Sequence, residues 1–242
     1  MIFLLILLIW IFNNMRQGIV IQGPTKYYKE LSDYYSQFEN VVWATWNDES
    51  VVRLDYIRNK GIEVILVEKP KISGYMNVNM QIKSTFAGVS YLEDKVNEVL
   101  KVRSDTIVTN LDKLLPKLRN RQLAFMATCK TGVRKDLSYD LVYYHNSHDY
   151  PADNVIYGKI GDLKIMFDFQ IDEMLPIPPE ALITWNYMVN KGIKFKLDYQ
   201  TMINGGISFF LQECLDENVK VNWLKRDVNL VNWYKDKTVY EW

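Results

Sequence analysis

The sequence predicts an α/β fold with a Rossmann-type, mainly parallel central sheet, helices on both of its faces, and an irregular C-terminal region. Over roughly the first hundred residues, short apolar runs alternate with segments of helical periodicity, which is typical of repeated strand–helix–strand units. The apolar runs end in polar or glycine-containing tips, and folds of this kind bind ligands at the carboxyl ends of their strands. Beyond residue 110 the alternation loosens, so a less regular second half is expected.

The N-terminal half contains four predicted strands joined by helical crossovers. Such crossovers require neighbouring strands to run parallel. Gly61 follows the second helix as its C-cap. The predicted strands are 18–21, 41–45, 62–67 and the run that ends at residue 103, and the predicted helices are 26–38, 50–60 and 77–93.

The third of these helices carries two stripes. An apolar stripe at spacings of 4, 3, 4 and 3 is formed by Val78, Ile82, Thr85, Val89 and Leu92. Such a stripe packs against a sheet. Beside it, Asn77, Gln81 and Ser84 form a polar stripe, and Asn79 lies on the same first turns. These neutral groups suit sugar hydroxyls and a ribose. Asn77 could instead be only the helix N-cap.

The C-terminal half is predicted with fewer regular elements. Helices are expected at 111–118 and 179–190, a strand at 123–128, and a strand end followed by a helix within 155–167. Pro179 and Glu180 suit the first turn of a helix. Residues 134–152 read as a long loop that contains both histidines.

Composition narrows the function classes. A chain of 242 residues can form one domain with a substantial core, and its formal net charge of zero argues against a polyanion-binding surface, so no nucleic acid partner is expected. Neither Cys129 nor Cys214 belongs to a zinc-type cluster, and both are expected to be reduced, buried thiols of a cytoplasmic protein.

The first fourteen residues are a separate problem. Residues 1–12 are almost wholly apolar but too short, as a helix, to cross a bilayer, and no signal-peptide pattern accompanies them. Three interpretations stay open: a short membrane anchor on the cytoplasmic face, a helix packed on the body, or a segment upstream of a true start at Met15. Residues 15–242 are expected to form a single domain.

Residues 97–108 are the most informative stretch. An apolar run ends abruptly at Arg103-Ser104-Asp105, and a second short apolar run follows. A carboxylate at the tip of a buried strand must be held by a metal, a ligand or a cation. Together with the polar stripe of the preceding helix, this tip suggests a nucleotide-sugar site.

Several short segments occur along the chain in the same order as similar motifs of a known family. They are Gln22-Gly23-Pro24, Thr45-Trp46, residues 77–85, residues 101–105, residues 153–163 and Pro179-Glu180. This ordered set, between Ile19 and Tyr187, resembles the WavE lipopolysaccharide-synthesis family, which is itself similar to GT-A glycosyltransferases. The chain departs from the GT-A Asp-x-Asp motif by carrying Arg103 in place of the first acid, and from the WavE pattern at Asn154 and Val155.

The resemblance implies a GT-A-like domain that transfers a sugar from a nucleotide-diphosphate donor to a glycan or lipid-linked acceptor, with Mn²⁺ or Mg²⁺. Residues 15–110 would then bind the nucleotide sugar, and residues 111–242 the acceptor. A divalent cation would neutralise the diphosphate as it departs. Asp105 is the predicted metal ligand, with His148 as a second ligand, although Asp105 could simply be a strand-end cap paired with Arg103.

The other candidate residues follow from their chemistry. Gln22, Gly23 and Pro24 would lie against the base or ribose, or form an ordinary turn. Trp46 would stack on the base, or belong to the core. Arg103 would contact phosphate through its planar fork, or form a salt bridge within the sheet. The base for an acceptor hydroxyl would be Asp153, with Asp149 and Glu180 as the other candidates.

Two further functions compete with a glycosyltransferase. A nucleotidyltransferase shares the nucleotide-binding half-sheet, but usually has a glycine-rich, basic loop after the first strand, and Gln22-Gly23-Pro24-Thr25-Lys26 matches that weakly. A degenerate, non-catalytic nucleotide-sugar-binding domain is the third possibility, which the replacement of the first acid by Arg103 keeps open.

Overall fold

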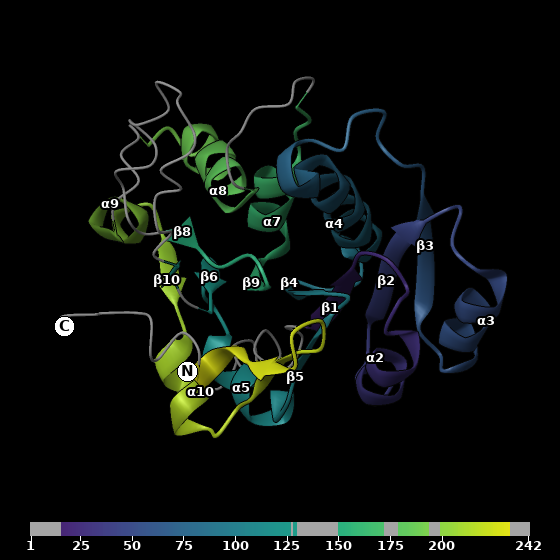
Figure 1. The fold of residues 1–242 in the computed structure, drawn as a ribbon. Helices are drawn as coiled ribbons and strands as arrows, with labels where there is room; N and C mark the ends of the chain where they lie inside the picture. The colour runs from purple at the N-terminus through teal and green to yellow at the C-terminus, as the bar shows by residue number, and fades with distance from the viewer. Residues whose placement is uncertain (1–15, 127, 130–149, 172–178, 194–198, 233–242) are drawn as a thin grey trace, which may run out of the picture.

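A seven-stranded sheet forms the centre of the computed structural model, which describes residues 16–126, 128–129, 150–171, 179–193 and 199–232 (Figure 1). The strand order is β10-β6-β9-β4-β1-β2-β3. Strands β1 (Gln17–Gln22), β2 (Val41–Trp46), β3 (Glu63–Val67) and β4 (Glu98–Arg103) run parallel. The predicted fold class, a Rossmann-type, mainly parallel sheet with helices on both faces, is confirmed.

The N-terminal half follows the predicted alternation closely. Helix α2 (Tyr28–Tyr35) joins β1 to β2, α3 (Val51–Asn59) joins β2 to β3, and α4 (Val78–Leu92) joins β3 to β4. A short 3-10 turn, η1 (Tyr75–Asn77), precedes α4. Because each connection contains a helix, the strand ends that carry the candidate residues meet at one edge of the sheet.

The C-terminal half extends the same sheet with a change of direction. Strand β9 (Val155–Lys159) lies antiparallel between β4 and β6 (Leu123–Phe125), and β10 (Ile207–Phe209) runs parallel to β6. The helices are α5 (Leu111–Leu118), α7 (Ile160–Phe167), α8 (Pro179–Asn190), α9 (Tyr199–Asn204) and α10 (Leu211–Asp216), and β7 (Thr128–Cys129) pairs with β8 (Tyr150–Pro151). The predicted helices 111–118 and 179–190 are confirmed.

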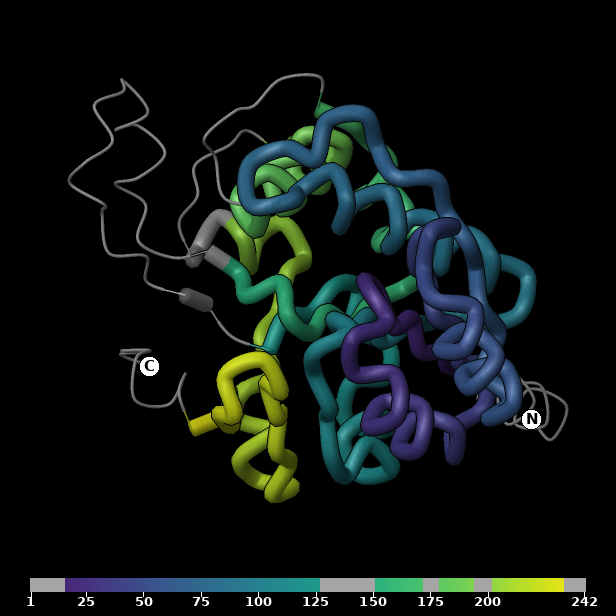
Figure 2. The backbone as a smooth tube through the Cα atoms, turned by 45° about the vertical axis from the view of Figure 1, so that its right-hand side comes forward, coloured from purple at the N-terminus to yellow at the C-terminus, as the bar shows by residue number. Residues whose placement is uncertain are grey.

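Both faces of the sheet are covered. Side chains alternate along β1, so Ile19 and Ile21 join one core with α2, α3, α5 and α10, while Val20 joins the other with α4, α7 and α8. Figures 1 and 2 show these two helical layers on opposite sides of the strands. Cys214 is buried in the first core, as predicted, whereas the side chain of Cys129 lies outside the described part.

A small second sheet brings the C-terminal region to the end of β4. Strand β5 (Thr106–Val108) follows Asp105 directly and pairs antiparallel with β11 (Val221–Trp223), which pairs in turn with β12 (Val228–Asn229). The amide of Leu224 donates to the carbonyl of Asp105 at 2.8 Å. Residues 221–225 are thereby fixed beside the acidic tip of β4.

The apolar N-terminal segment, residues 1–15, lies outside the described ranges. Within those ranges, no helix combines the length and the apolar character needed to cross a bilayer.

Candidate active site

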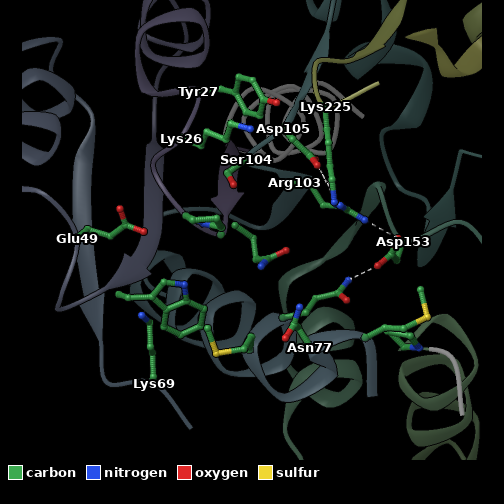
Figure 3. A pocket seen from close by; sticks show the side chains of 18 of the residues that line it. Lys26, Tyr27, Glu49, Lys69, Asn77, Arg103, Ser104, Asp105, Asp153 and Lys225 are labelled. Atoms are coloured by element: carbon green, nitrogen blue, oxygen red, sulfur yellow. Dashed lines mark hydrogen bonds and ion pairs between the residues drawn. The ribbon is translucent and has the colours of Figure 1, made fainter. Parts of the chain in front are cut away.

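A cavity of about 510 Å³ opens at the carboxyl ends of β1, β2 and β4 (Figure 3). Its walls come from the loops after these strands, the start of α4, the start of α8, and the turn after β11. They are formed by Gln22, Gly23, Pro24, Lys26, Tyr27, Trp46, Glu49, Lys69, Met76, Asn77, Met80, Gln81, Arg103, Ser104, Asp105, Asp153, Pro179, Glu180 and Lys225. This edge is where a parallel sheet of this kind binds ligands.

Most of the predicted site residues lie together at this cavity. Those in its walls are Gln22, Gly23, Pro24, Trp46, Asn77, Gln81, Arg103, Asp105, Asp153 and Glu180. Asp149 and His148, with His145, fall in residues 130–149, outside the described part of the chain. The roles expected of Asp149 in catalysis and of His148 in metal binding therefore remain predictions.

Two predicted residues do not face the cavity. Asn79 is buried and holds two loops, because its amide donates to the carbonyls of Ile72 (2.9 Å) and Ile171 (2.6 Å) and its oxygen accepts from the Ile171 amide. Ser84 donates to the Met80 carbonyl at 2.7 Å, which satisfies its hydroxyl within α4. The prediction that these two residues bind the nucleotide sugar does not fit the structure.

The loop after β1 is held tightly around Gly23. Its φ is +119°, and a Cβ there would lie 2.7 Å from the Ser104 hydroxyl. The indole of Trp43 donates to the Gly23 carbonyl at 3.0 Å. Only glycine lets the backbone of this loop approach the tip of β4 so closely.

The start of α4 is also unusual. Met76 and Asn77 have φ of 50° and 63°, in the left-handed region that non-glycine residues rarely adopt. Asn77 occupies the N-cap position without a capping hydrogen bond from its side chain. Its amide is therefore not used by the helix and lies in the cavity wall, where strained backbone often marks a ligand site.

Asp105 is held by four hydrogen bonds at the end of β4. Arg103 donates from Nε to Oδ1 (3.2 Å) and from Nη2 to Oδ2 (3.0 Å). Trp223 donates from Nε1 to Oδ2 at 2.9 Å, and Thr106 from its hydroxyl to Oδ1 at 3.3 Å. Burial alone would raise the pKa of Asp105, but Arg103 and these donors bring the pKa below its usual value.

This arrangement does not fit a divalent cation at Asp105. A carboxylate offers about four lone-pair positions, and the four donors take them all. Among the described residues, no cluster of three or more His, Cys, Asp or Glu side chains could hold a metal ion. The structure thus corresponds to the alternative of a strand-end cap paired with Arg103.

Asp153 lies across the cavity floor from this pair. Its Oδ2 accepts from the Gln81 amide at 2.6 Å, and its Oδ1 is 3.8 Å from Nη1 of Arg103. Its backbone carbonyl accepts from Nζ of Lys101 at 2.6 Å. Three side chains from β4 and α4 therefore fix both the backbone and the carboxylate of Asp153. Figure 3 marks the contact between Arg103 and Asp153.

Two groups beside Asp153, the buried Lys101 and the half-buried Glu180, have displaced pKa values. Burial lowers the pKa of Lys101 to about 8, although Asp153 opposes the change. Glu180, in the first turn of α8, is surrounded by protein but keeps contact with the cavity. Burial, and next the charge of Asp153, raise its pKa well above the usual value. Glu180 is consequently protonated at pH values where Asp105 is ionised, and it can donate a hydrogen bond.

The positive side chains of the walls differ in their partners. Lys69 pairs with Asp48 at 2.5 Å, and Arg103 pairs with Asp105. Lys26 and Lys225 are exposed and form no ion pair with a described residue; the ammonium of Lys26 lies 5.2 Å from the ring centre of Tyr27. Among the described wall residues, Lys26 and Lys225 can therefore meet an anionic ligand without breaking an ion pair, whereas Arg103 is already held by Asp105.

Sequence reasoning missed Lys101, Lys225 and Trp223 as members of this site. Lys101 was visible as a charged residue inside an otherwise apolar strand, which is a recognisable signal of a buried partner. Trp223 and Lys225 carried no such signal, because Trp223 lies 118 positions from Asp105 and reaches it only through the pairing of β5 with β11.

Comparison with known proteins gives similarity of fold only. No family model matches the chain, and no curated protein matches it. Similar solved structures include 4-diphosphocytidyl-2C-methyl-D-erythritol synthase from Anaerococcus prevotii (9% identity, 80% of this chain and 97% of that one, TM-score 0.47). A protein described as glucose-1-phosphate thymidylyltransferase from Bacillus anthracis has 7% identity over 80% and 85% of the chains, with a TM-score of 0.47. Mannose-1-phosphate geranyltransferase from Thermus thermophilus has 10% identity over 71% and 68%, with a TM-score of 0.40.

The activities in these names do not transfer to this chain at such low similarity. The thymidylyltransferase name belongs to the nucleotidyltransferase class, which is the alternative considered from the sequence, and none of the three names a glycosyltransferase.

Proposed function

We propose that this protein is a transferase that binds a nucleotide-activated sugar and transfers the sugar to an acceptor hydroxyl. The observation that carries the proposal is one cavity whose wall contains three cations, Arg103, Lys26 and Lys225, and also two acids, Asp153 and Glu180. A diphosphate needs the cations, and an acceptor hydroxyl needs a base.

Each part of such a donor has suitable groups in the walls. Arg103, Lys26 and Lys225 suit the diphosphate, because they are positive and reach the cavity. Tyr27, which is half-buried, offers aromatic surface to the base, whereas Trp46 is 3% exposed and is mainly a core residue at the wall. Asn77, Gln81 and Gln22 offer amides to the sugar and ribose hydroxyls.

The proposed chemistry is a single displacement at the anomeric carbon. The acceptor oxygen forms a bond to that carbon while the bond to the diphosphate oxygen breaks, and the electron pair leaves with the nucleoside diphosphate. Asp153 takes the acceptor proton through Oδ1, which accepts no hydrogen bond from a described residue. Protonated Glu180 lowers the local negative charge, so a departing diphosphate is less strongly repelled.

Nucleotidyl transfer is the second candidate. The supporting observation is the loop after β1, where Gly23 brings the backbone close to the tip of β4 and Lys26 follows without an ion-pair partner among the described residues. A sugar phosphate attacks as an anion, however, and needs no base. The Asp153 carboxylate would repel such an anion but not a neutral hydroxyl, which favours the hydroxyl acceptor.

A metal role for Asp105 stays a prediction from the sequence. If Mg²⁺ or Mn²⁺ takes part, it would assist departure of the diphosphate. No step proposed here depends on it, because the lone pairs of Asp105 are already taken by Arg103, Trp223 and Thr106.

The test is to incubate the full chain with UDP-, GDP-, CDP- and dTDP-sugars plus simple acceptors, with Mg²⁺ and Mn²⁺ present. Release of a nucleoside diphosphate together with a glycosylated acceptor supports the proposal. Inorganic diphosphate released from a nucleoside triphosphate and a sugar phosphate would identify nucleotidyl transfer instead. Neither product, from protein that binds a nucleotide sugar, would indicate a non-catalytic binding domain.

A matched pair of variants tests the role of the acid. Asp153→Asn should reduce turnover by about 100- to 10,000-fold, the usual contribution of a general base, while donor binding persists. Asp112→Asn, on the exposed surface of α5, is the control. Full turnover by Asp153→Asn would refute the assignment.

A further inference from the structure

We infer that the diphosphate of the donor is bound by Arg103, Lys26 and Lys225, and that this binding needs no divalent cation. The inference rests on the proposed function, because it concerns how a nucleotide diphosphate is held in the same cavity. It states which protein cations neutralise the diphosphate, and it does not concern the transfer step.

The first argument is the state of the acid at the strand tip. Asp105 is nearly buried, and its two oxygens receive hydrogen bonds from Arg103, Trp223 and Thr106. A cation that entered here would have to displace a guanidinium bound through two parallel hydrogen bonds, which is a strong, specific contact. It would also leave that guanidinium beside the metal, where like charges repel.

The second argument is the capacity of Arg103 itself. Two of its N–H groups donate to Asp105, and Nη1, which donates no hydrogen bond to a described residue, lies 3.8 Å from Oδ1 of Asp153. The side chain is about 30% exposed and lies in the cavity wall. Because Asp105 fixes the plane of the guanidinium, the free edge is held in position for a phosphate with little loss of side-chain entropy.

The third argument is that two lysines of the cavity wall form no ion pair with a described residue. Lys69 is paired with Asp48, and Lys101 is buried against the carbonyl of Asp153. Lys26 and Lys225 have no ion-pair partner in the part of the chain that the structure describes. Figure 3 shows both on the same side of the cavity as Arg103 and Asp105, away from Lys69 and Glu49.

The position of Lys225 connects this site to the fold. The turn after β11 is fixed to Asp105 by the Trp223 indole and by the Leu224 amide. The same strand-tip acid therefore orients Arg103 on one side and the turn that carries Lys225 on the other. Asp105 acts as an organiser of cations, a role that does not need a metal.

The experiment measures binding of UDP, GDP, CDP and dTDP, and of inorganic diphosphate, to the full chain by titration calorimetry. Each titration is run once with excess EDTA and once with Mn²⁺. We expect at least one nucleotide to bind in EDTA with a Kd within about threefold of the value in Mn²⁺. Inorganic diphosphate should compete with it, since it occupies the same cations.

Three variants identify the residues. Arg103→Gln should weaken nucleotide binding in EDTA by about tenfold or more, as expected for hydrogen bonds to a charged group. Lys26→Gln and Lys225→Gln, which are exposed and should fold normally, should each weaken binding by about threefold or more. Arg58→Gln, which lies exposed on α3 outside the cavity wall and pairs with Asp55, should leave the Kd unchanged.

The outcomes separate the inference from the proposed function. A nucleotide that binds only with Mn²⁺ overturns the inference and leaves the proposed function standing. Unchanged affinity in Lys26→Gln and Lys225→Gln also overturns it, whatever the folding of the Arg103 variant. Binding of inorganic diphosphate without any nucleotide would support the anion site and refute the proposed donor. No binding under either condition refutes both.

Discussion

Replacing Lys101 by Met should change the pH dependence of stability in a way that can be worked out from the structure. The Lys101 side chain is fully buried in β4, and its ammonium donates to the Asp153 carbonyl. Burial lowers its pKa from 10.5 to about 8. At about 1.4 kcal/mol for each pH unit, this corresponds to about 3 kcal/mol.

The sign follows from proton binding in the two states. Between about pH 8 and 10.5 the folded state has lost the Lys101 proton while the unfolded state keeps it, so the stability of the wild type rises with pH across this window. Below about pH 8 both states are charged, and the full cost of burying the ammonium is present. Methionine has a similar shape and no charge, so the variant lacks this dependence.

Two opposing effects set the stability of the variant at pH 7. Removing the buried charge relieves about 3 kcal/mol, and leaving the Asp153 carbonyl without its donor costs roughly 1–3 kcal/mol. Lys101→Met should therefore equal the wild type at pH 7 or exceed it by up to about 2 kcal/mol. Between pH 7 and pH 10 the free energy of unfolding of the wild type, relative to that of the variant, should rise by about 3 kcal/mol.

Urea unfolding followed by tryptophan fluorescence at pH 7 and pH 10 measures this difference. Titrating groups distant from Lys101 contribute equally to both proteins and cancel in the comparison. Glu180 does not, because the charge of Lys101 lowers its pKa, so the comparison is made in a Glu180→Gln background as well. Lys113→Met, on the exposed surface of α5 with no ion pair to a described residue, should show no such change. A Lys101→Met difference that is the same at both pH values would refute the reasoning.

Three further predictions concern the other walls of the cavity. Gly23→Ala should destabilise by about 1–3 kcal/mol in urea unfolding, because its φ is +119° and the new methyl would lie 2.7 Å from the Ser104 hydroxyl; Gly61→Ala, which meets nothing within 4 Å, should cost less. As the pH rises from about 5 to 8, Glu180→Gln should lose less stability than the wild type. In this window the unfolded wild type has released the Glu180 proton while the folded state, whose pKa is raised, still holds it. An equal change in the free energy of unfolding of both proteins would contradict this. Asp105→Asn should lower the free energy of unfolding by about 2–4 kcal/mol, since it leaves a partly buried guanidinium without its partner. Because Asp105 orients Arg103, Asp105→Asn should weaken nucleotide binding by the same factor in EDTA and in Mn²⁺. Weakening seen only in the titration with Mn²⁺ would favour a metal ligand.

The sequence predicted the fold better than it predicted the site. The strands and helices up to Asp105 follow from local periodicity, and the structure reproduces them within a few residues. The polar stripe of α4 was a weaker guide, because a helix presents polar groups to loops as well as to ligands. Gln81 lies in the cavity, whereas Asn79 binds the backbone of Ile72 and Ile171.

The part of the site that could not be predicted depends on contacts between distant segments. Nothing near Asp105 in the sequence indicates that Trp223 would donate to it, since the contact requires β11 to pair with β5. The same holds for Lys225. Long-range pairings of this kind are fixed by the whole fold, and local pattern carries no information on them.

The segment from Lys101 to Asp105 nevertheless indicated that the acid at its end would pair with cations from the same strand. Side chains two apart on a strand share a face, so Lys101 and Arg103 must both point to one side of β4, toward the acid that follows. In the structure that face also meets Asp153 from the neighbouring chain segment, and the two cations and two acids form one connected group. A strand-tip acid preceded by cations on its own face already has its partners. It is therefore better placed to orient positive charge toward a ligand than to bind a metal ion.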